Sequence, residues 1–237
     1  PNQLKPGIKD RTLLDRWILS ELHKTIADTR ARLDNYDIYA AAQGLNTFVE
    51  SLSNWYVRRS RDRFWSGWQT KDMSSAHDCE KLSAYWTLYE CLLTMSQLAA
   101  PFVPFMAEEL WQNLARMPLG DKVPESVHLC DYPESDTSII DKQLADEIAL
   151  VREIASLGRA ARANAKLKTR QPLRQAIIAF SGDVRVPIGR QTIRIGGSSV
   201  VDIEEKIAIF QDSQRKIIDK HKETLKQELN VKEISYV

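Results

Sequence analysis

The 237-residue sequence predicts a mainly α-helical fold, with an antiparallel helical bundle followed by a small α+β module. As far as Ala165, apolar side chains recur every three or four residues, as they do on amphipathic helices, and few Gly or Pro interrupt them. After Ala165 the pattern changes to short β-type runs separated by glycines. These patterns divide the chain into a linker at 1–9, a helical bundle at 10–136, a connecting basic helix at 137–170 and an α+β module at 171–237.

The predicted bundle is a succession of helices joined by short connections. The first helix runs from Asp10 to Asp34, and the second covers Ile38–Arg63 and carries one apolar face. The third ends before Pro101, because the residue before a proline resists the α conformation. The fourth begins at Pro104, since proline suits the first turn of a helix. The apolar face of the second helix consists of Leu45, Phe48, Val49, Leu52 and Tyr56.

Beyond the bundle, the pattern predicts a loop, a fifth helix and then the α+β module. The loop contains a short extended piece at Ser126–Cys130, and the fifth helix covers Ile139–Ala165. A turn or linker is expected at Gly196–Ser199. The strands and the helix of the module are predicted at Ala176–Phe180, Val184–Ile188, Gln191–Ile195, Ile203–Leu229 (the helix) and Val231–Val237.

Composition is that of an ordinary globular protein, because 43% hydrophobic and 27% charged residues suffice to build a core. The formal net charge is +1, so any affinity for nucleic acid has to come from local basic patches. The three cysteines are widely spaced and form no C-x-x-C pair, which argues against a disulfide framework and a structural zinc site. Such cysteines fit a reducing setting, so we expect a cytoplasmic protein. No apolar run has the length of a membrane span, and no membrane partner is expected.

The segment NWYVRRSRDRFW, Asn54–Trp65, places four arginines among four aromatic side chains. On the predicted second helix, Leu52 and Tyr56 face the core, and another set of residues lies on the opposite face at spacings of i, i+4, i+7 and i+11. This outward set is Asn54, Arg58, Arg61 and Trp65. Guanidinium groups suit phosphates, and an indole can stack on an unpaired base, so the set is a candidate RNA-binding surface.

A plainer interpretation of the same segment stays open. It makes the segment a solvated helix end with Trp55, Phe64 and Trp65 in the core. Arg59 and Arg63 lie nearer the apolar side of the helix, where they can pair with carboxylates between helices.

A second basic cluster begins on the fifth helix and continues beyond it. Glu153 is the only acidic residue between Arg152 and Arg174. A strip of this kind suits a phosphate backbone, and its binding would weaken steeply with salt. The alternative is a charged face that meets only water. The candidate RNA-binding residues of the cluster are Arg152, Arg159, Arg162, Lys166, Lys168 and Arg170.

The sequence holds no recognisable catalytic constellation. The four histidines are scattered without the spacing of metal ligands, and there is no P-loop, no G-x-G-x-x-G and no G-x-S-x-G motif. We therefore expect no catalytic residue, no metal site and no cofactor in this chain.

Several segments, taken in order, resemble the C-terminal half of isoleucyl-tRNA synthetase, a class I aminoacyl-tRNA synthetase. LAAPFVPFMAEELWQ is largely shared with the valyl and leucyl relatives, whereas NWYVRRSRDRFW favours the isoleucyl enzyme. The segments are DRWILSEL (Asp15–Leu22), NWYVRRSRDRFW (Asn54–Trp65), LAAPFVPFMAEELWQ (Leu98–Gln112), SVHLCDYP (Ser126–Pro133), RQPL (Arg170–Leu173) and ELNVKEISYV (Glu228–Val237).

The resemblance implies that the bundle is an anticodon-binding domain, docking on the anticodon stem-loop of the isoleucine tRNA. The family's reaction is isoleucylation of tRNA with ATP and Mg²⁺ in a catalytic domain, and an inserted domain edits valine by hydrolysis. The HIGH-type and KMSKS-type signatures of the catalytic domain are absent from this sequence. We therefore expect a non-catalytic part of a longer enzyme, which begins downstream of the catalytic domain and has that domain as its partner.

Two other hypotheses remain. The chain could be the equivalent domain of a valyl- or leucyl-tRNA synthetase, which differs in the tRNA selected. It could also be a non-enzymatic helical scaffold that binds protein partners, and a large exposed apolar patch would be the mark of that function.

Overall fold

The computed structural model describes residues 5–70, 75–178, 186–188, 191–193 and 213–236. It confirms a mainly α-helical fold with a small α+β part. The chain forms two compact units, Pro1–Ala145 and Asp146–Val237. The finer division into a linker, a bundle, a connecting helix and a module stays a prediction.

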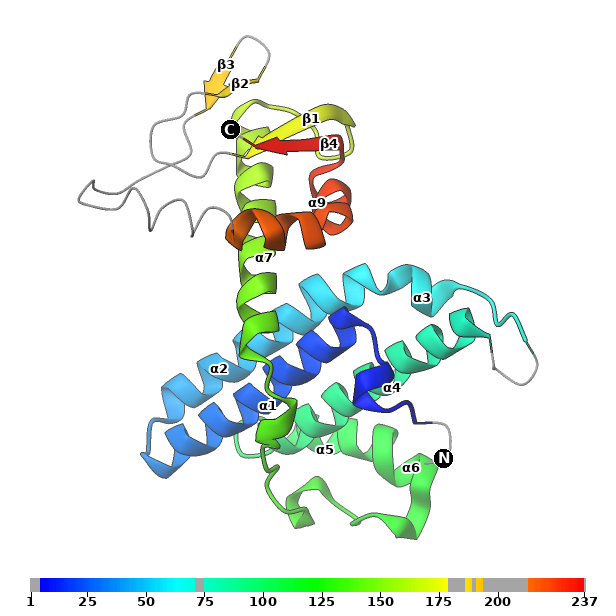
Figure 1. Cartoon of the computed structure of the whole chain (residues 1–237). Coiled ribbons are helices and arrows are strands. Elements are labelled where there is room, and N and C mark those ends of the chain that lie inside the picture. The colour runs from blue at the N-terminus through cyan, green and yellow to red at the C-terminus, as the bar shows by residue number, and fades with distance from the viewer. Residues whose placement is uncertain (1–4, 71–74, 179–185, 189–190, 194–212, 237) are drawn as a thin grey trace. The chain divides into compact units, whose positions relative to one another are not determined.

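The first unit is a helical bundle (Figure 1). Its α-helices are α1 (Leu13–Asp34), α2 (Ile38–Ser51), α3 (Arg61–Trp65), α4 (Ala76–Ala99), α5 (Pro104–Trp111) and α6 (Met117–Leu119). π-helical segments at Leu52–Val57 and Gln112–Arg116 continue α2 and α5. The helix predicted at Ile38–Arg63 is therefore interrupted, since it passes through a π-helical segment and then a turn at Ser60 before α3. α1 packs against α2 and α4, and α4 packs against α5.

A capping box starts α1 at Leu13 rather than at the predicted Asp10. Thr12 Oγ1 accepts a hydrogen bond from the Asp15 N–H (3.3 Å), and the Asp15 carboxylate accepts one from the Thr12 N–H (3.2 Å). Both N–H groups would otherwise lack a partner within the helix. Asp10 instead ends a short 3-10 turn that begins at Ile8.

A Schellman motif ends α1 and turns the chain into α2. The Tyr36 N–H donates to the Leu33 carbonyl (2.9 Å), and Tyr36 itself has a left-handed φ of +60°. The Asp37 N–H donates to the Arg32 carbonyl (2.8 Å). Asp37 then caps α2 by accepting a hydrogen bond from the Ala40 N–H (3.1 Å). This short turn sets α1 and α2 side by side and antiparallel (Figure 1).

The main core of the bundle is formed by one face each of α1, α2 and α4. Leu52 and Tyr56 are buried as predicted, but Val49 is 46% exposed, because it lies beside the line of buried positions on α2. The face that α4 buries is rich in small side chains, whereas Tyr85 on the same helix is exposed. The buried side chains of this core include Trp17, Ile18, Leu22, Ile26, Leu45, Phe48, Trp55, Ala84, Cys91, Met95 and Leu98.

A smaller core lies between α5 and the chain that follows α6. Ala107, Trp111 and Val127 are buried in it, and the Trp111 indole donates to the Pro124 carbonyl (3.0 Å). The extended piece predicted at Ser126–Cys130 is wrong, since Val127–Leu129 form a 3-10 turn. Ser126 Oγ caps this turn by accepting a hydrogen bond from the His128 N–H (3.2 Å).

The last part of the first unit runs along α1. The Asp141 N–H donates to Ser20 Oγ (2.8 Å), and the Ser135 hydroxyl donates to the His23 carbonyl (2.7 Å). The helix that follows, α7 (Lys142–Asn164), begins three residues after the predicted start at Ile139.

The second unit combines most of α7 with a parallel strand pair and C-terminal helices. Leu173 of β1 (Leu173–Ile178) pairs with Val231 of β4 (Val231–Tyr236), and the register continues to Ile178 and Tyr236. β2 (Val186–Ile188) and β3 (Gln191–Ile193) form a separate antiparallel pair. Of the long helix predicted to end at Leu229, residues 213–220 and α9 (Lys222–Leu229) are helical, and a turn at His221 separates them. The predicted turn at 196–199 and the predicted helix start at 203–212 lie outside the described residues.

Across the described part of the chain, the structure contains no helix with the length and apolar character that crossing a bilayer requires.

Candidate nucleic-acid interface

The outward set predicted on the second helix lies on the surface of the protein. Asn54, Arg58, Arg61 and Trp65 are all exposed, and the Trp65 side chain is 80% exposed. The Arg58 Nε donates to the Asn54 carbonyl (2.9 Å), which holds the base of the guanidinium group near the helix. Two cations, an amide and an indole are thus accessible here, with Asn54 and Arg58 on the segment that joins α2 to α3 and Arg61 and Trp65 on α3.

The opposite side of the same segment is fastened to α1 through Asp15. The Tyr56 hydroxyl donates to Asp15 Oδ1 (2.6 Å), and Arg63 donates to both carboxylate oxygens (2.9 and 2.6 Å). Burial by itself would raise the pKa of Asp15, but the hydrogen bonds and the charge of Arg63 lower it below its ordinary value. Burial and the neighbouring carboxylate raise the pKa of Tyr56. The predicted interhelical pairing is therefore confirmed for Arg63.

The aromatic side chains of the segment divide between the core and the surface. Trp55 is 4% exposed, and the guanidinium groups of Arg58 and Arg59 lie 5.8 and 5.7 Å from the centre of its ring. Phe64 is half-buried and meets Tyr85 edge to face at 5.2 Å. The plainer interpretation, with all three rings in the core, is wrong for Trp65.

Further exposed aromatic residues that the sequence patterns did not indicate lie just beyond the end of α3 and on α4. Trp68 and Tyr85 are each 45% exposed, and the ammonium group of Lys81 lies 4.7 Å from the centre of the Trp68 ring. The spacing of Trp65 and Trp68 is visible in the sequence. The contact of Trp68 with Lys81 of α4 is not visible there, because it joins residues that are distant along the chain.

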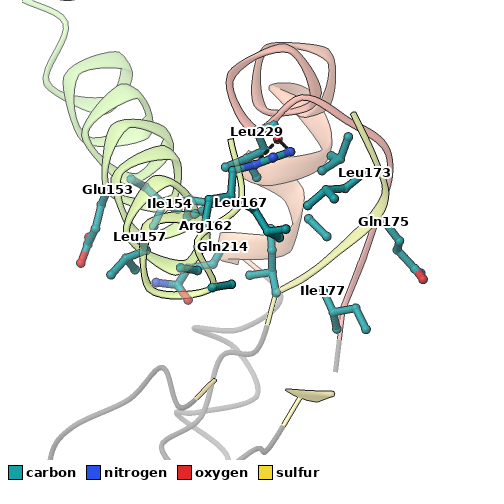
Figure 2. A pocket seen from close by; sticks show the side chains of 17 residues that line it. Glu153, Ile154, Leu157, Arg162, Leu167, Leu173, Gln175, Ile177, Gln214 and Leu229 are labelled. Atoms are coloured by element: carbon teal, nitrogen blue, oxygen red, sulfur yellow. Dashed lines mark hydrogen bonds between the residues drawn. The ribbon is translucent and has the colours of Figure 1, made fainter. Parts of the chain in front are cut away.

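The second basic cluster is not a continuous outward strip. Arg162 is 6% exposed, and its N–H groups donate to backbone carbonyls at the end of α9 and after α7. Figure 2 shows it directed toward Leu229 beside an apolar groove of about 250 Å³, with Ile154 and Leu173 in its lining. The carbonyls that accept from Arg162 belong to Lys168, Gln171, Leu229 and Asn230.

Arg162 therefore does not belong to the candidate surface, because its guanidinium group is buried in hydrogen bonds that join the end of α7 to the end of α9. Arg159 is exposed, but its guanidinium pairs with the buried carboxylate of Glu228 at 3.0 Å. Lys166, Lys168 and Arg170 are exposed, and Arg152 is partly buried. An RNA contact by these residues stays a prediction.

Two of the histidines make structural contacts. Burial lowers the pKa of His23, and its Nδ1 accepts a hydrogen bond from the Asp136 N–H (3.0 Å), as a neutral ring does. His221 is buried against Glu147 at 3.2 Å. Within the described ranges, no three His, Cys, Asp or Glu side chains are grouped so that they could hold a metal ion.

Exposed apolar side chains, which are the mark of the alternative scaffold function, also occur near α5 and α6. Phe105 is 91% exposed, and Val103, Met106, Met117 and Leu129 are exposed as well. Nothing in the described residues indicates what covers them.

Comparison with known proteins identifies the class of protein that has this helical bundle. Residues 15–178 match the family described as the anticodon-binding domain of tRNA ligase. This match covers more than half of the sequence, and the chain belongs to that family.

Relatives within the class point to one kind of ligase. An isoleucine–tRNA ligase of Dehalococcoides mccartyi is 51% identical over 172 residues, which is 72% of this chain. The isoleucine–tRNA ligase of Thermobifida fusca is 46% identical over 77% of the chain, and that of Clostridium acetobutylicum is 38% identical over 93%. The chain spans 16% of the length of the first two relatives and 21% of the third. These matches confirm the resemblance to isoleucyl-tRNA synthetase.

Proposed function

We propose that this chain is the tRNA-binding part of an isoleucine–tRNA ligase and that its bundle docks on the anticodon stem-loop of the isoleucine tRNA. The observation that carries the proposal is the outward set Asn54, Arg58, Arg61 and Trp65, which is exposed on a segment that Asp15 fixes from the other side. Membership of the anticodon-binding family and the named relatives support the choice of ligand.

The chemistry of the outward set suits an RNA stem that ends in a loop. The forked guanidinium groups of Arg58 and Arg61 match phosphate oxygens, and contacts of this kind set the position of the RNA. The Trp65 indole offers a flat face for an unpaired base, which only a loop can supply. Lys166, Lys168 and Arg170, which are exposed on the second unit, would also bind the phosphate backbone.

In the whole enzyme this part would hold the tRNA while a catalytic domain of the same chain joins isoleucine to it. That reaction would use ATP and Mg²⁺, and the sites that bind them would lie in the catalytic domain. The enzyme would work in the cytoplasm, where protein synthesis takes place.

The function is tested by titrating the 237-residue chain with isoleucine, valine and leucine tRNAs at about 50 and 200 mM salt. We expect tighter binding of the isoleucine tRNA and a steep loss of affinity with salt. Equal binding of all three tRNAs would contradict selection by this chain. It would indicate that the chain contacts only the phosphate backbone of the RNA. Absence of binding at low salt would contradict the function itself.

The double substitution Arg58→Ala and Arg61→Ala tests the surface. Loss of two charged contacts should weaken binding of isoleucine tRNA at least tenfold, or about 1.5 kcal/mol, and reduce the salt slope by about 1 to 2. The melting temperature should stay within about 2 °C, because both side chains are exposed. Arg30→Ala, on an exposed arginine of α1, is the matched control. A large fall in melting temperature with unchanged binding would contradict the assignment.

A further inference from the structure

The segment that follows the outward arginines is fastened to the beginning of α4 by a buried carboxylate. Asp78 is completely buried and accepts hydrogen bonds from the Gln69 N–H (2.8 Å), the Thr70 N–H (2.9 Å) and the Thr70 hydroxyl (2.8 Å). Burial would raise the pKa of Asp78, but these hydrogen bonds lower it below its ordinary value. Ser75 fixes Asp78 in turn, by capping α4 at the Asp78 N–H (3.0 Å). The backbone of Gln69 and Thr70 is therefore held in one place.

A buried lysine fastens the same segment at a second point. Lys81 is 6% exposed, and its ammonium group donates to the Ser66 carbonyl. The same ammonium lies 4.7 Å from the centre of the Trp68 ring and 5.8 Å from that of Tyr85. Contacts between a desolvated cation and aromatic faces fix both rings in position.

A third connection runs from Tyr85 back to the end of α3. The Tyr85 hydroxyl donates to the Phe64 carbonyl (3.2 Å), and the two rings meet edge to face at 5.2 Å. Arg63 adds a hydrogen bond to the Glu80 carbonyl (2.8 Å). The backbone on both sides of Trp65 is thus tied to the first turns of α4.

This ordered segment nevertheless leaves large aromatic surfaces in water. Trp65 is 80% exposed, and Trp68 and Tyr85 are each 45% exposed. Exposed rings add little to the stability of the fold, whereas rings fixed in advance lower the entropy cost of binding a flat partner. The arrangement therefore indicates a binding surface, and the cations on the neighbouring helix turns favour a polyanion as the partner.

We propose that Trp68 and Tyr85, which both contact the Lys81 ammonium group, form a preformed stacking platform for unpaired bases of an RNA loop, and that Lys81 and Asp78 are positioning residues of this platform. The proposal rests on the proposed function, because Arg58 and Arg61 would hold the stem from which the loop extends. Stacking on aromatic rings is tolerant of base identity, so the platform would distinguish loops from duplexes rather than one base from another.

The test compares two RNAs on the 237-residue chain. One is a hairpin with the anticodon stem and loop of the isoleucine tRNA, and the other is a blunt duplex of the same stem sequence. The wild-type chain should bind the hairpin more tightly, and the hairpin should quench its tryptophan fluorescence. Trp68→Ala should lower hairpin affinity about tenfold, the size expected for one lost base stack, and leave duplex affinity and its salt slope unchanged.

Lys81→Met keeps the aliphatic stem and removes the ammonium group, so it tests positioning. We expect a loss of hairpin affinity of about three- to tenfold without a loss of duplex affinity. Equal losses for hairpin and duplex would indicate a structural role and overturn the positioning role of Lys81. Phe105→Ala removes an exposed ring on α5 and is the matched control, with no expected change in either affinity.

The outcomes separate the platform from the function on which it rests. If Trp68→Ala binds the hairpin like wild type while the Arg58 and Arg61 double variant binds it weakly, the platform is overturned and the function stands. A wild-type chain that binds hairpin and duplex equally also overturns the platform. A chain that binds neither RNA overturns both and leaves the rings as a protein-docking surface.

Discussion

Asp15 is a single carboxylate that connects three parts of the first unit. It closes the capping box of α1, accepts a hydrogen bond from the Tyr56 hydroxyl and forms a two-pronged pair with Arg63. The side chain is completely buried, so each of its oxygen atoms depends on these partners in place of water. The direction in which Arg58 and Arg61 face is thereby determined by a residue that lies more than forty positions earlier in the chain.

Arg63→Ala should destabilise the first unit by about 3 kcal/mol, because it leaves the buried charge of Asp15 without its cationic partner. Denaturant unfolding followed by circular dichroism measures the change. Arg61→Ala, two residues away on the exposed side, is the control and should change the free energy of unfolding by less than about 0.5 kcal/mol. Equal effects of the two substitutions would contradict the assigned pairing.

Residues on opposite faces of one helix could be separated from the sequence, because helical phase is a local property. It predicted the exposure of Asn54, Arg58, Arg61 and Trp65, although a π-helical segment and a turn at Ser60 interrupt the continuous helix on which that phase was based. Arg162 could not be placed in this way. Its burial depends on carbonyl groups that α9 brings to the end of α7, and no local pattern records such a meeting.

At the scale of the element, the turn between α1 and α2 carries a residue that its conformation does not favour. Tyr36 occupies the left-handed position of a Schellman motif, where glycine is usual, and its side chain is 89% exposed. The left-handed conformation is sterically unfavourable for a tyrosine, and the exposed side chain makes little packing that could offset this strain.

Tyr36→Gly should therefore stabilise the chain by about 0.5 to 1 kcal/mol, after allowance for the greater freedom of glycine in the unfolded state. Tyr39→Gly makes the same chemical change three residues later, within α2, where glycine costs about 1 kcal/mol. Thermal or denaturant unfolding of the two variants should show opposite signs. Changes of the same sign would contradict the role assigned to the turn.

Elements were easiest to predict where their ends carry a local cue. Proline at 101 and 104 located the end of α4 and the start of α5 within two residues. The start of α1 was placed three residues early, since Thr12 and Asp15 form a capping box that the apolar pattern does not register. The stacking platform could not be predicted, because Asp78 and Lys81 act on residues that lie 8 to 15 positions earlier, beyond the reach of a helical pattern.

At the scale of the whole molecule, carboxylates with lowered pKa values gather in the first unit among the residues that the structure describes. Burial raises the pKa of these groups, but hydrogen bonds from N–H, O–H and cationic groups outweigh it. The carboxylates are Asp15, Asp78, Glu90, Glu108 and Asp136.

Acid should therefore unfold the first unit. A carboxylate whose pKa is lower in the folded chain takes up its proton first in the unfolded chain, so falling pH favours unfolding. The stability that these groups contribute is complete above about pH 5 and declines as the pH falls through 4 and below. Melting temperatures at several pH values measure it. Asp15→Asn should lower stability at pH 7 and reduce the pH dependence, whereas Asp62→Asn, on an exposed side chain, is the control. An unchanged pH dependence in Asp15→Asn would contradict the linkage.

The class of protein was accessible from the sequence because its motifs retain their order along the chain. The boundary between the two units was less accessible, since α7 is one continuous helix from Lys142 to Asn164 and the units divide within it, at Ala145. A helix that belongs to two compact units has no break in its periodicity to mark the division.

The π-helical segment Leu52–Val57 has a consequence for how this surface can change in evolution. A π turn holds one residue more than an α turn, and each residue rotates an α-helix by about 100°. A chain one residue shorter in this segment could form an α turn in the same place, and Arg58 beyond it would keep its direction, because the wider turn absorbs the extra residue. The same deletion in the α-helical part of α2 has no such turn to absorb it, and it would rotate the residues beyond it by about 100°. The surface therefore tolerates a change of chain length at the π turn but not within α2.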